Sequence, residues 1–576
     1  MSSKTSTDTI MKVGLAVIVL GLVVLAWVSA FLGEMLTPTG MPWTDFDALT
    51  AKVKAREFAW PGAATWILIV LAIVGMVAAG AIIGATGGKG SSSQREIAGR
   101  LATAGKLAPL TKKHRKREAK QLHPAAVDLP VGQVVGKTAA GKSMVLYQGW
   151  RDLGTCVMGP GSGKTSCFVI PRLAAAPGAA LMTSNKVDGV EEVIAARHEL
   201  GTIWLFDPTQ IYRQSTQPDF IFDPIRQIKG TEDAMRLAAW IITASLKNNP
   251  RSKGDVAEDA QFGPSGESCL AWMLLAASVS DGHLADVHEW VSKGSYEKVS
   301  NILASNGYSM PSSEMKGFDK WPDKTRGSLV ATTQRMCRDL VHDAIRAWTT
   351  PTLGIRNFDP AEFMIGRQTM ILLSERGPGG AGAVITSMIK AICNAAVKAT
   401  PGKARLTVPL VGELDEVANI VPWPTLPQDF SHYGSRGLCF TIYLQGWSQG
   451  CEEWGENGMK TLWQMSGTRF IGANEEESWT SGLSKTLGTY QKPLPGSDMK
   501  ERLPKVSVED FANIPKFSGL LTTSVAPAAF VLLTPWHRDK KLKKVIEAGL
   551  PAAEAMAEGS PQPVAAVVEE QEKVEA

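Results

Sequence analysis

Cysteine is scarce in this sequence, and its seven residues are too scattered to form a structural framework. They stand at positions 156, 167, 269, 337, 393, 439 and 451, and no two are arranged as C-x-x-C. Zinc sites and disulfide scaffolds depend on paired or regularly spaced cysteines, so the sequence indicates neither. This pattern is typical of a protein that lies in a reducing compartment.

Several other signals are also missing. Net charge is only +4 over 576 residues, so bulk charge indicates no partner. The zinc motif H-E-x-x-H is missing, which excludes the membrane proteases that use it. There is no internal repeat. What is present is a chain long enough for two or more domains.

Charge is nevertheless unevenly distributed along the chain. Residues 111–120 read TKKHRKREAK and are strongly basic, whereas the tail from about Pro551 is rich in Ala, Pro and Glu. The tail composition predicts an acidic, disordered segment. A basic run is usually a solvated face, but close behind an apolar segment it also attracts anionic lipid.

Two apolar runs near the N-terminus are long enough to cross a membrane. They cover Val13–Leu32 and Gly62–Ala85, each near the roughly 20 residues that a spanning helix needs. A signal peptide is the alternative for the first run, but a second run follows soon after it. Basic residues flank the pair at positions 4, 12, 89, 95, 100 and 106. The positive-inside rule therefore predicts a multi-pass protein of the cell membrane with both ends, and most of the chain, in the cytoplasm.

A strand, a glycine-rich loop and a helix are predicted in direct succession over Gly154–Ser166, GTCVMGPGSGKTS. Glycine N–H groups at a helix start can converge on phosphate oxygens. Lys164 would reach the β- and γ-phosphates of a nucleotide, and Thr165 would offer its hydroxyl to Mg²⁺. Met158 occupies the place of the pattern's first glycine. The predicted phosphate-binding residues are Gly159, Pro160, Gly161, Ser162, Gly163, Lys164, Thr165 and Ser166.

Paired acids follow a second predicted strand, in the sequence LTVPLVGELDE at 406–416. We expect this strand to lie beside the phosphate-loop strand. Asp415 can then hold Mg²⁺ through a bound water, and Glu416 can deprotonate the water that attacks the γ-phosphate. Gln445 ends another predicted strand, where it can sense the γ-phosphate. Arg436 precedes that strand and is either a functional group or ordinary surface.

Strands alternate with helices at the spacing of βαβ units, which predicts an α/β fold with a parallel sheet. The alternation stops between about 231 and 350, where the pattern is helical and predicts an inserted all-α domain. A mobile loop is expected over 250–266 and a single helix over 326–348. The predicted order is a tail (1–12), a span (13–32), an external loop (33–61), a span (62–85), a basic linker (86–140), a nucleotide-binding domain (141–230 and 356–545), the helical insertion between its parts (231–355) and a disordered tail (546–576).

This order of segments resembles the type IV secretion coupling proteins, the TraG/TraD-like ATPases of conjugation. The matching stretches are MGPGSGKT, TSNKVDG, LFDPT, FDPI, LLSERGPGGAG, LDEVANI, YLQGWSQ and VLLTPWHRD. The resemblance implies two transmembrane helices and a RecA-like P-loop NTPase with a helical insertion. It also implies an ATP- and Mg²⁺-dependent motor, acting as a homo-hexamer, that delivers relaxase-bound single-stranded DNA to a type IV secretion channel.

By the same resemblance, each candidate residue has a role. Lys164 and Thr165 match the Walker A pair, Asp415 and Glu416 match the Walker B pair, and Gln445 matches a motor glutamine. Arg436 stands where the family has an arginine that reaches a neighbour's nucleotide. Lys186 lacks the aspartate that the family often has before it, because Thr183-Ser184-Asn185 precede it, so its role stays open.

Three alternative functions are weighed against this one. A duplex translocase of the FtsK type would carry a winged-helix reader, and only a short helix and a tail follow Asp539. A type VII protein-export ATPase usually repeats the NTPase domain, and the chain has one phosphate loop. A catalytically inactive scaffold would not need the four Walker-type residues. The DNA contact is predicted in the insertion, through Lys316, Lys320 and Lys324 with Trp321, and the basic stretch 111–120 is the contrasting candidate.

Overall fold

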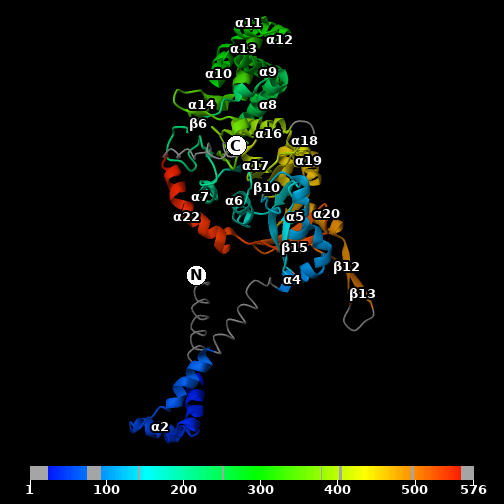
Figure 1. Cartoon of the computed structure of the whole chain (residues 1–576). Coiled ribbons are helices and arrows are strands. Elements are labelled where there is room, and N and C mark those ends of the chain that lie inside the picture. The colour runs from blue at the N-terminus through cyan, green and yellow to red at the C-terminus, as the bar shows by residue number, and fades with distance from the viewer. Residues whose placement is uncertain are drawn as a thin grey trace. The chain divides into compact units, whose positions relative to one another are not determined.

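A computed structural model describes residues 24–73, 92–126, 128–139, 143–249, 252–377, 379–400, 405–493 and 499–559 (Figure 1). The chain divides into two compact units, Met1–Ser91 and Ser92–Ala576. In the first unit, residues 24–36 and 62–73 are helical and flank α2 (Phe46–Lys54). The predicted spans 13–32 and 62–85 lie partly outside the described residues. Among those that are described, no helix combines the length and the apolar character needed to cross a bilayer.

The second unit is built on a mixed sheet, which has eleven strands among the described residues. Seven neighbouring strands run parallel, as the alternation of strands and helices predicted. In sheet order these are β11 (Thr468–Ile471), β3 (Gly154–Val157), β10 (Leu438–Leu444), β9 (Leu410–Leu414), β4 (Ala180–Ser184), β8 (Thr369–Leu373) and β5 (Ile203–Phe206). Beyond β11 the sheet continues antiparallel through β14 (Ser518–Thr523), β15 (Ala529–Leu532), β1 (Gln133–Thr138) and β2 (Val145–Gln148).

One sequence prediction about this sheet is wrong. The strand that leads to Asp415, β9, does not lie beside the phosphate-loop strand β3, because β10 runs between them. Thr441 of β10 is in register with Gly154 on one side and with Glu413 on the other. Chain order does not specify sheet order, since the crossover through α18 (Leu426–Arg436) returns the chain to the gap between the two strands.

Helices cover both faces of the sheet and form two cores. On one face α16 (Gly382–Lys398), α18 and α19 (Trp447–Met465) pack on a core that includes Val157 and Leu181. On the other face α6 (Ile170–Ala174), α7 (Val190–Arg197) and α22 (Lys540–Ala557) pack on a core that includes Cys156 and Met182. Successive strand residues therefore point to opposite faces, and both faces are apolar, as a parallel sheet covered on both sides requires.

Helix α22 corrects the prediction of disorder from residue 546. Its buried residues Ile546, Gly549, Ala553 and Met556 recur at helical spacing and form one apolar face. An added Cβ at Gly549 would meet the carbonyl oxygen of Ala195 at 2.1 Å, so the helix lies directly on α7. The composition indicated disorder, but that prediction failed because Ala and Glu also favour helix. Residues 560–576 lie outside the described part of the chain.

Between β5 and β8 the chain forms a helical segment with a core of its own (Figure 1). The mobile loop expected over 250–266 is mostly helical, because α9 begins at Lys253 behind a capping box of Ser252 and Asp255. The single helix expected over 326–348 is broken after Met336. At the break, Asp339 accepts hydrogen bonds from Asn248 and Asn249. The segment consists of α8 (Thr231–Asn248), α9 (Lys253–Val279), α10 (Leu284–Lys293), α11 (Tyr296–Ser305), α12 (Ser309–Asp319), α13 (Asp323–Met336) and α14 (Asp343–Thr349).

Candidate active site

The glycine-rich loop leaves the carboxyl end of β3 and enters η2 (Thr165–Val169), a π-helical turn that continues into α6. Gly161 and Gly163 have φ angles of 66° and 104°, in the left-handed region that side chains rarely adopt. A Cβ at Gly163 would also meet the ring of Phe517 at 2.7 Å. The backbone conformation therefore favours glycine at both positions, and the contact with Phe517 is a second reason for it at position 163.

Lys164 is mostly buried, and its ammonium group turns back onto the loop. Nζ donates to the carbonyl oxygens of Met158 at 2.8 Å and Gly159 at 3.3 Å. Two hydroxyls also bond within the loop: Ser162 Oγ donates to Gly159 O at 2.6 Å, and Ser166 Oγ donates to Gly163 O at 3.4 Å. These local bonds hold the loop in an arch over the start of η2.

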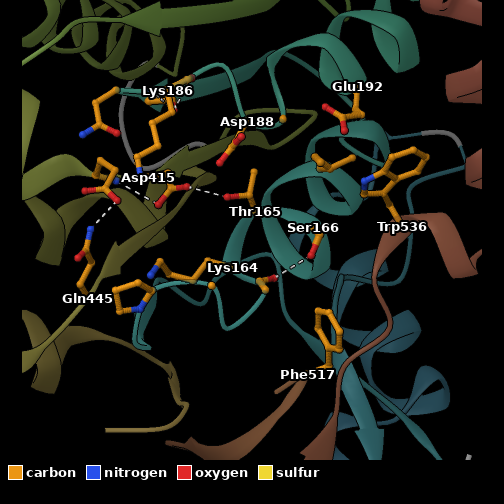
Figure 2. Close-up of a pocket in the computed structure, with 18 of the residues that line it drawn as sticks. Lys164, Thr165, Ser166, Lys186, Asp188, Glu192, Asp415, Gln445, Phe517 and Trp536 are labelled. Carbon is orange, nitrogen blue, oxygen red and sulfur yellow. Dashed lines mark hydrogen bonds between the residues drawn. The ribbon is translucent and has the colours of Figure 1, made fainter. Parts of the chain in front are cut away.

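The loop is joined to the acidic pair by a direct contact. Thr165 Oγ1 donates to Asp415 Oδ2 at 3.2 Å, across 250 residues of sequence (Figure 2). Thr183 Oγ1, at the neighbouring end of β4, donates to the carbonyl oxygen of Asp415 at 2.7 Å and fixes its backbone. Burial, and next the charge of Glu416, raises the pKa of Asp415 to about 6, although Lys164 opposes the shift.

Glu416 has a backbone conformation that is unusual for its type, with φ 54° and ψ 25°. Such strain costs about 1–3 kcal/mol and is concentrated at functional sites. Its Oε1 accepts a hydrogen bond from Gln445 Nε2 at 2.8 Å, and its Oε2 accepts one from Asn419 Nδ2. Gln445 follows directly on β10, the strand between β3 and β9, so the corrected strand order explains why these two side chains meet.

These residues surround one cavity of about 430 Å³ (Figure 2). Most of the residues predicted from the sequence line it: Pro160, Gly161, Gly163, Lys164, Thr165, Ser166, Asp415, Glu416 and Gln445. A hydroxyl and a carboxylate side by side, as in Thr165 and Asp415, are hard oxygen ligands of the kind that Mg²⁺ takes together with phosphate oxygens. The donor set therefore fits Mg²⁺ held with a nucleotide.

Arg436 is not part of this cavity. It ends α18 before the amino end of β10, whereas Gln445 follows the carboxyl end of that strand. The seven residues of β10 span about 23 Å, so Arg436 lies at the opposite edge of the sheet. Its Nη1 donates to the carbonyl oxygen of Thr400 at 3.5 Å.

Other residues line the cavity that sequence reasoning did not assign. Phe517, just before β14, and Trp536, after β15, bring two aromatic rings to it. Lys186 reaches it from the loop after β4, and Glu192 reaches it from α7 (Figure 2). Phe517 packs on the loop itself and has a φ of 60°. For Trp536, the signal in the sequence was the stretch VLLTPWHRD, which brings an aromatic residue and two basic residues together.

A buried carboxylate, that of Glu413, lies in β9 two residues before Asp415. Glu413 of β9 is inaccessible to solvent and accepts a hydrogen bond from the Tyr443 hydroxyl. The Arg172 guanidinium lies 3.8 Å from it and also donates to Thr441 Oγ1 at 3.0 Å. Burial raises the pKa of Glu413 to about 7. The acid that interrupts the apolar pattern of β9 is thus paired within the sheet rather than exposed.

Comparison with known proteins covers part of the chain. Residues 409–498, which include Asp415, Glu416 and Gln445, match the family model described as the TraM recognition site of TraD and TraG. Comparison with curated proteins gave no match.

Solved structures similar to this chain include the unbound bacterial conjugative coupling protein TrwBdeltaN70, at 15% identity and a TM-score of 0.48 over 67% of this chain and 85% of that one. The plasmid coupling protein TrwB in complex with ADP and Mg²⁺ is 15% identical, with a TM-score of 0.47 over 67% and 86%. VirB4 of Thermoanaerobacter pseudethanolicus is 10% identical, with a TM-score of 0.40 over 70% and 96%. The match over residues 409–498 confirms the resemblance to the TraG/TraD-like type IV coupling proteins that the sequence motifs indicated.

Proposed function

We propose that this chain is an ATPase whose nucleotide binds in the cavity above the start of η2. The observation that carries this proposal is that two motifs 250 residues apart meet there, through the Thr165–Asp415 contact. The loop N–H groups and Lys164 would bind the phosphates, and Thr165 and Asp415 would hold Mg²⁺. Bound Mg²⁺ would neutralise charge on the β- and γ-phosphate oxygens.

The chain's own groups account for the remaining chemistry. Lys164 would exchange its bonds to Met158 and Gly159 for bonds to phosphate oxygens. Glu416 would take a proton from the attacking water at a carboxylate oxygen, held in orientation by Gln445 and Asn419. Phosphoryl transfer depends mainly on such positioning and on charge stabilisation.

We further propose the role that the family resemblance implies. The ATPase would be anchored in the cell membrane through 13–32 and 62–85 and would assemble as a homo-hexamer. It would deliver relaxase-bound single-stranded DNA to a type IV secretion channel. Measuring ATP hydrolysis by the purified full chain with single-stranded DNA, duplex DNA or none tests this. Stimulation by single strands supports the proposal, stimulation by duplex alone favours an FtsK-type motor, and a rate indifferent to both favours protein export.

The raised pKa of Asp415 predicts a pH dependence. A metal ligand must be deprotonated, so Mg²⁺-dependent binding of a fluorescent ATP analogue should weaken by up to about tenfold per pH unit below about pH 6. Binding measured in EDTA serves as the control for the nucleotide's own titration. A Mg²⁺-dependent component that stays flat from pH 7 down to pH 5 would show that Asp415 is not the ligand.

Arg436 is predicted to act on a neighbouring subunit, because it lies at the opposite sheet edge from its own cavity. Arg436→Ala should bind ATP normally but hydrolyse it at least about tenfold more slowly. Mixed rings of Arg436→Ala with Lys164→Ala chains should recover activity, since some interfaces then pair an intact loop with an intact arginine. Normal hydrolysis by Arg436→Ala would mean that this arginine is ordinary surface.

Membrane anchoring predicts a labelling pattern in intact cells. In a background without native cysteines, a cysteine replacing Thr44 should react with an impermeant reagent, since the loop 33–61 would be external. A cysteine replacing Ser92 should stay protected until the cells are opened. Labelling of the Ser92 position in intact cells would contradict the two-span arrangement.

A further inference from the structure

A second cavity, of about 700 Å³, lies beside α5 (Lys112–Leu122) and does not share residues with the candidate active site. One wall is the helix and the other is the segment 128–131. The polar side chains along it are Lys112, Lys116, Lys120, His123 and Asp128, so basic residues predominate. We call this cavity the α5 groove.

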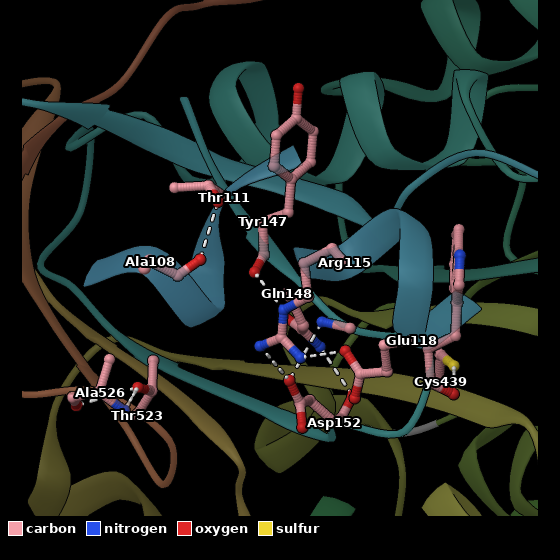
Figure 3. A network of polar contacts seen from close by, with 12 residues as sticks. Ala108, Thr111, Arg115, Glu118, Tyr147, Gln148, Asp152, Cys439, Thr523 and Ala526 are labelled. Atoms are coloured by element: carbon pink, nitrogen blue, oxygen red, sulfur yellow. Dashed lines mark hydrogen bonds and ion pairs between the residues drawn. The ribbon is translucent and has the colours of Figure 1, made fainter. Parts of the chain in front are cut away.

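The helix is held firmly in place by its one buried arginine. Arg115 is 2% exposed, and its guanidinium donates to Asp152 Oδ2 at 2.9 Å, to Glu118 Oε2 at 2.5 Å and to the carbonyl oxygen of Tyr147 at 3.2 Å (Figure 3). A buried charge with three partners orients α5 on β2, because breaking such a pair is costly. The backbone positions of the remaining basic residues of the helix are therefore fixed relative to the sheet.

Three lysines line the groove at intervals of four residues. Lys112, Lys116 and Lys120 lie on one helix face, with a rise of about 6 Å from each to the next. All three are exposed, and the structure records no ion pair for them among the described residues. A straight row of unpaired cations in a recess suits a polyanion with regularly spaced charges.

His123 adds a polar group at the wall of the groove. Its Nδ1 lies 2.9 Å from the carbonyl oxygen of Leu406 and 3.1 Å from that of Thr407. Because carbonyl oxygens only accept, Nδ1 carries a hydrogen. Nε2 is buried and has no hydrogen-bond partner among the residues that the structure describes. A buried polar atom without a partner is uncommon and indicates that something else completes its surroundings.

The shape of the groove favours a nucleic acid strand over a membrane. A lipid surface is flat and would meet the part of α5 outside the groove, where Lys113 and Arg117 are exposed. A phosphate backbone can instead enter a recess. Among the described residues of the lining there is no Phe, Tyr or Trp, and the imidazole of His123 is only 2% exposed, so bases have no open ring on which to stack. Contacts would therefore be to phosphate and would not depend on base sequence.

The competing site in the helical segment is less suited to this role. Trp321, the aromatic residue among its lysines, packs edge-on against Phe318 with ring centroids 5.1 Å apart. It also packs against the helical core. The aromatic group that was expected to stack with bases is thus partly buried against the core of that segment.

We propose that the α5 groove binds the phosphate backbone of single-stranded nucleic acid through Lys112, Lys116 and Lys120. The proposal rests on the proposed function only for the choice of a single strand as the polyanion. It is independent of nucleotide chemistry, so binding measured without ATP can fail or succeed whatever the ATPase result.

The test compares two double variants of the full chain that carry the same change in charge. Lys116→Glu/Lys120→Glu reverses two lysines that line the groove, and Lys113→Glu/Arg117→Glu reverses two basic residues of the same helix that do not line it. Binding of a fluorescein-labelled oligothymidine is measured from about 50 to 200 mM salt. The groove variant should bind about tenfold or more weakly at the lowest salt, and its log–log salt slope should fall by about 1.4. The affinity of the Lys113→Glu/Arg117→Glu variant should change by less than about twofold.

Three outcomes would overturn the proposal. Equal losses in both variants would mean that general charge, not the groove, attracts the strand. An unchanged affinity of the groove variant for oligothymidine would mean that Lys116 and Lys120 do not contact the strand. Loss of binding to phosphatidylglycerol vesicles, with oligothymidine binding kept, would make α5 a lipid-binding helix. Lys116→Gln/Lys120→Gln, with thermal unfolding of every variant, separates a lost contact from a lost fold.

Discussion

Lys164→Ala is expected to lower ATP turnover by about a thousandfold and to weaken nucleotide binding as well. The ammonium group is the one cation of the loop, and it is mostly buried within 3.3 Å of two loop carbonyls. In a site that excludes water, a charge aimed at phosphate oxygens stabilises the transition state far more than it would in solvent. Losing a charge-assisted hydrogen bond costs about 1.5–3 kcal/mol of binding, or roughly tenfold to a hundredfold in Kd.

The matched control is Lys186→Ala, which removes a second lysine from the same cavity. Lys186 lies in the loop after β4, and its backbone, not its side chain, bonds to Ser184. Turnover and Kd are measured for both variants by a coupled hydrolysis assay and by titration of a fluorescent ATP analogue. If Lys186→Ala loses as much activity as Lys164→Ala, the effect reports the overall charge of the cavity. The specific role proposed for Lys164 would then be wrong.

Glu416→Gln should separate binding from hydrolysis. We expect normal ATP affinity and a fall in kcat of about a hundredfold or more, because glutamine keeps the shape of the side chain but cannot accept a proton. Gln445 and Asn419 orient the carboxylate in the present structure, and an amide can keep only part of that bonding. Single-turnover measurements with saturating nucleotide isolate the chemical step from product release.

Glu192→Gln is the control for that substitution. Glu192 lines the same cavity, and burial raises the pKa of its carboxyl group, so it too is an acid in a partly desolvated setting. It lies on α7, away from the Glu416–Gln445 contact. Wild-type turnover by Glu416→Gln, or an equal fall in both variants, would remove Glu416 from the role of base.

The glycine-rich loop was predictable because its function needs a local arrangement. Gly161 and Gly163 adopt backbone angles that other residues avoid, and the strand before them and the helix after them are adjacent in sequence. The parallel strands β8 and β10 also carry a local signal, since both are buried throughout and read as continuous apolar runs. The residues that specify each of these elements lie together in one short stretch of the chain.

The helical segment shows where local patterns mislead. Residues 253–266 are polar and contain glycine and proline, yet they continue α9, because the Ser252–Asp255 capping box starts the helix early. Arg335 also stabilises that turn, through Asp259 Oδ1 at 2.9 Å and Glu258 Oε2 at 3.0 Å. Arg335 itself comes from α13, 76 residues further along the chain than Asp259. Helix propensity depends only on residue type, so it cannot predict a contact between residues far apart in the chain.

The sequence by itself determined that the chain has a phosphate-type loop, an acidic pair and an alternating α/β order, because each depends on residues close together in the chain. Only the tertiary structure decided which strand lies between β3 and β9, that Gln445 therefore meets Glu416, and that Arg436 lies at the far edge of the sheet. It also decided that Lys112, Lys116 and Lys120 line a groove while Trp321 packs against the helical core. Neighbours in space are set by how crossovers and helices pack to bury apolar surface, and that packing is a property of the whole chain.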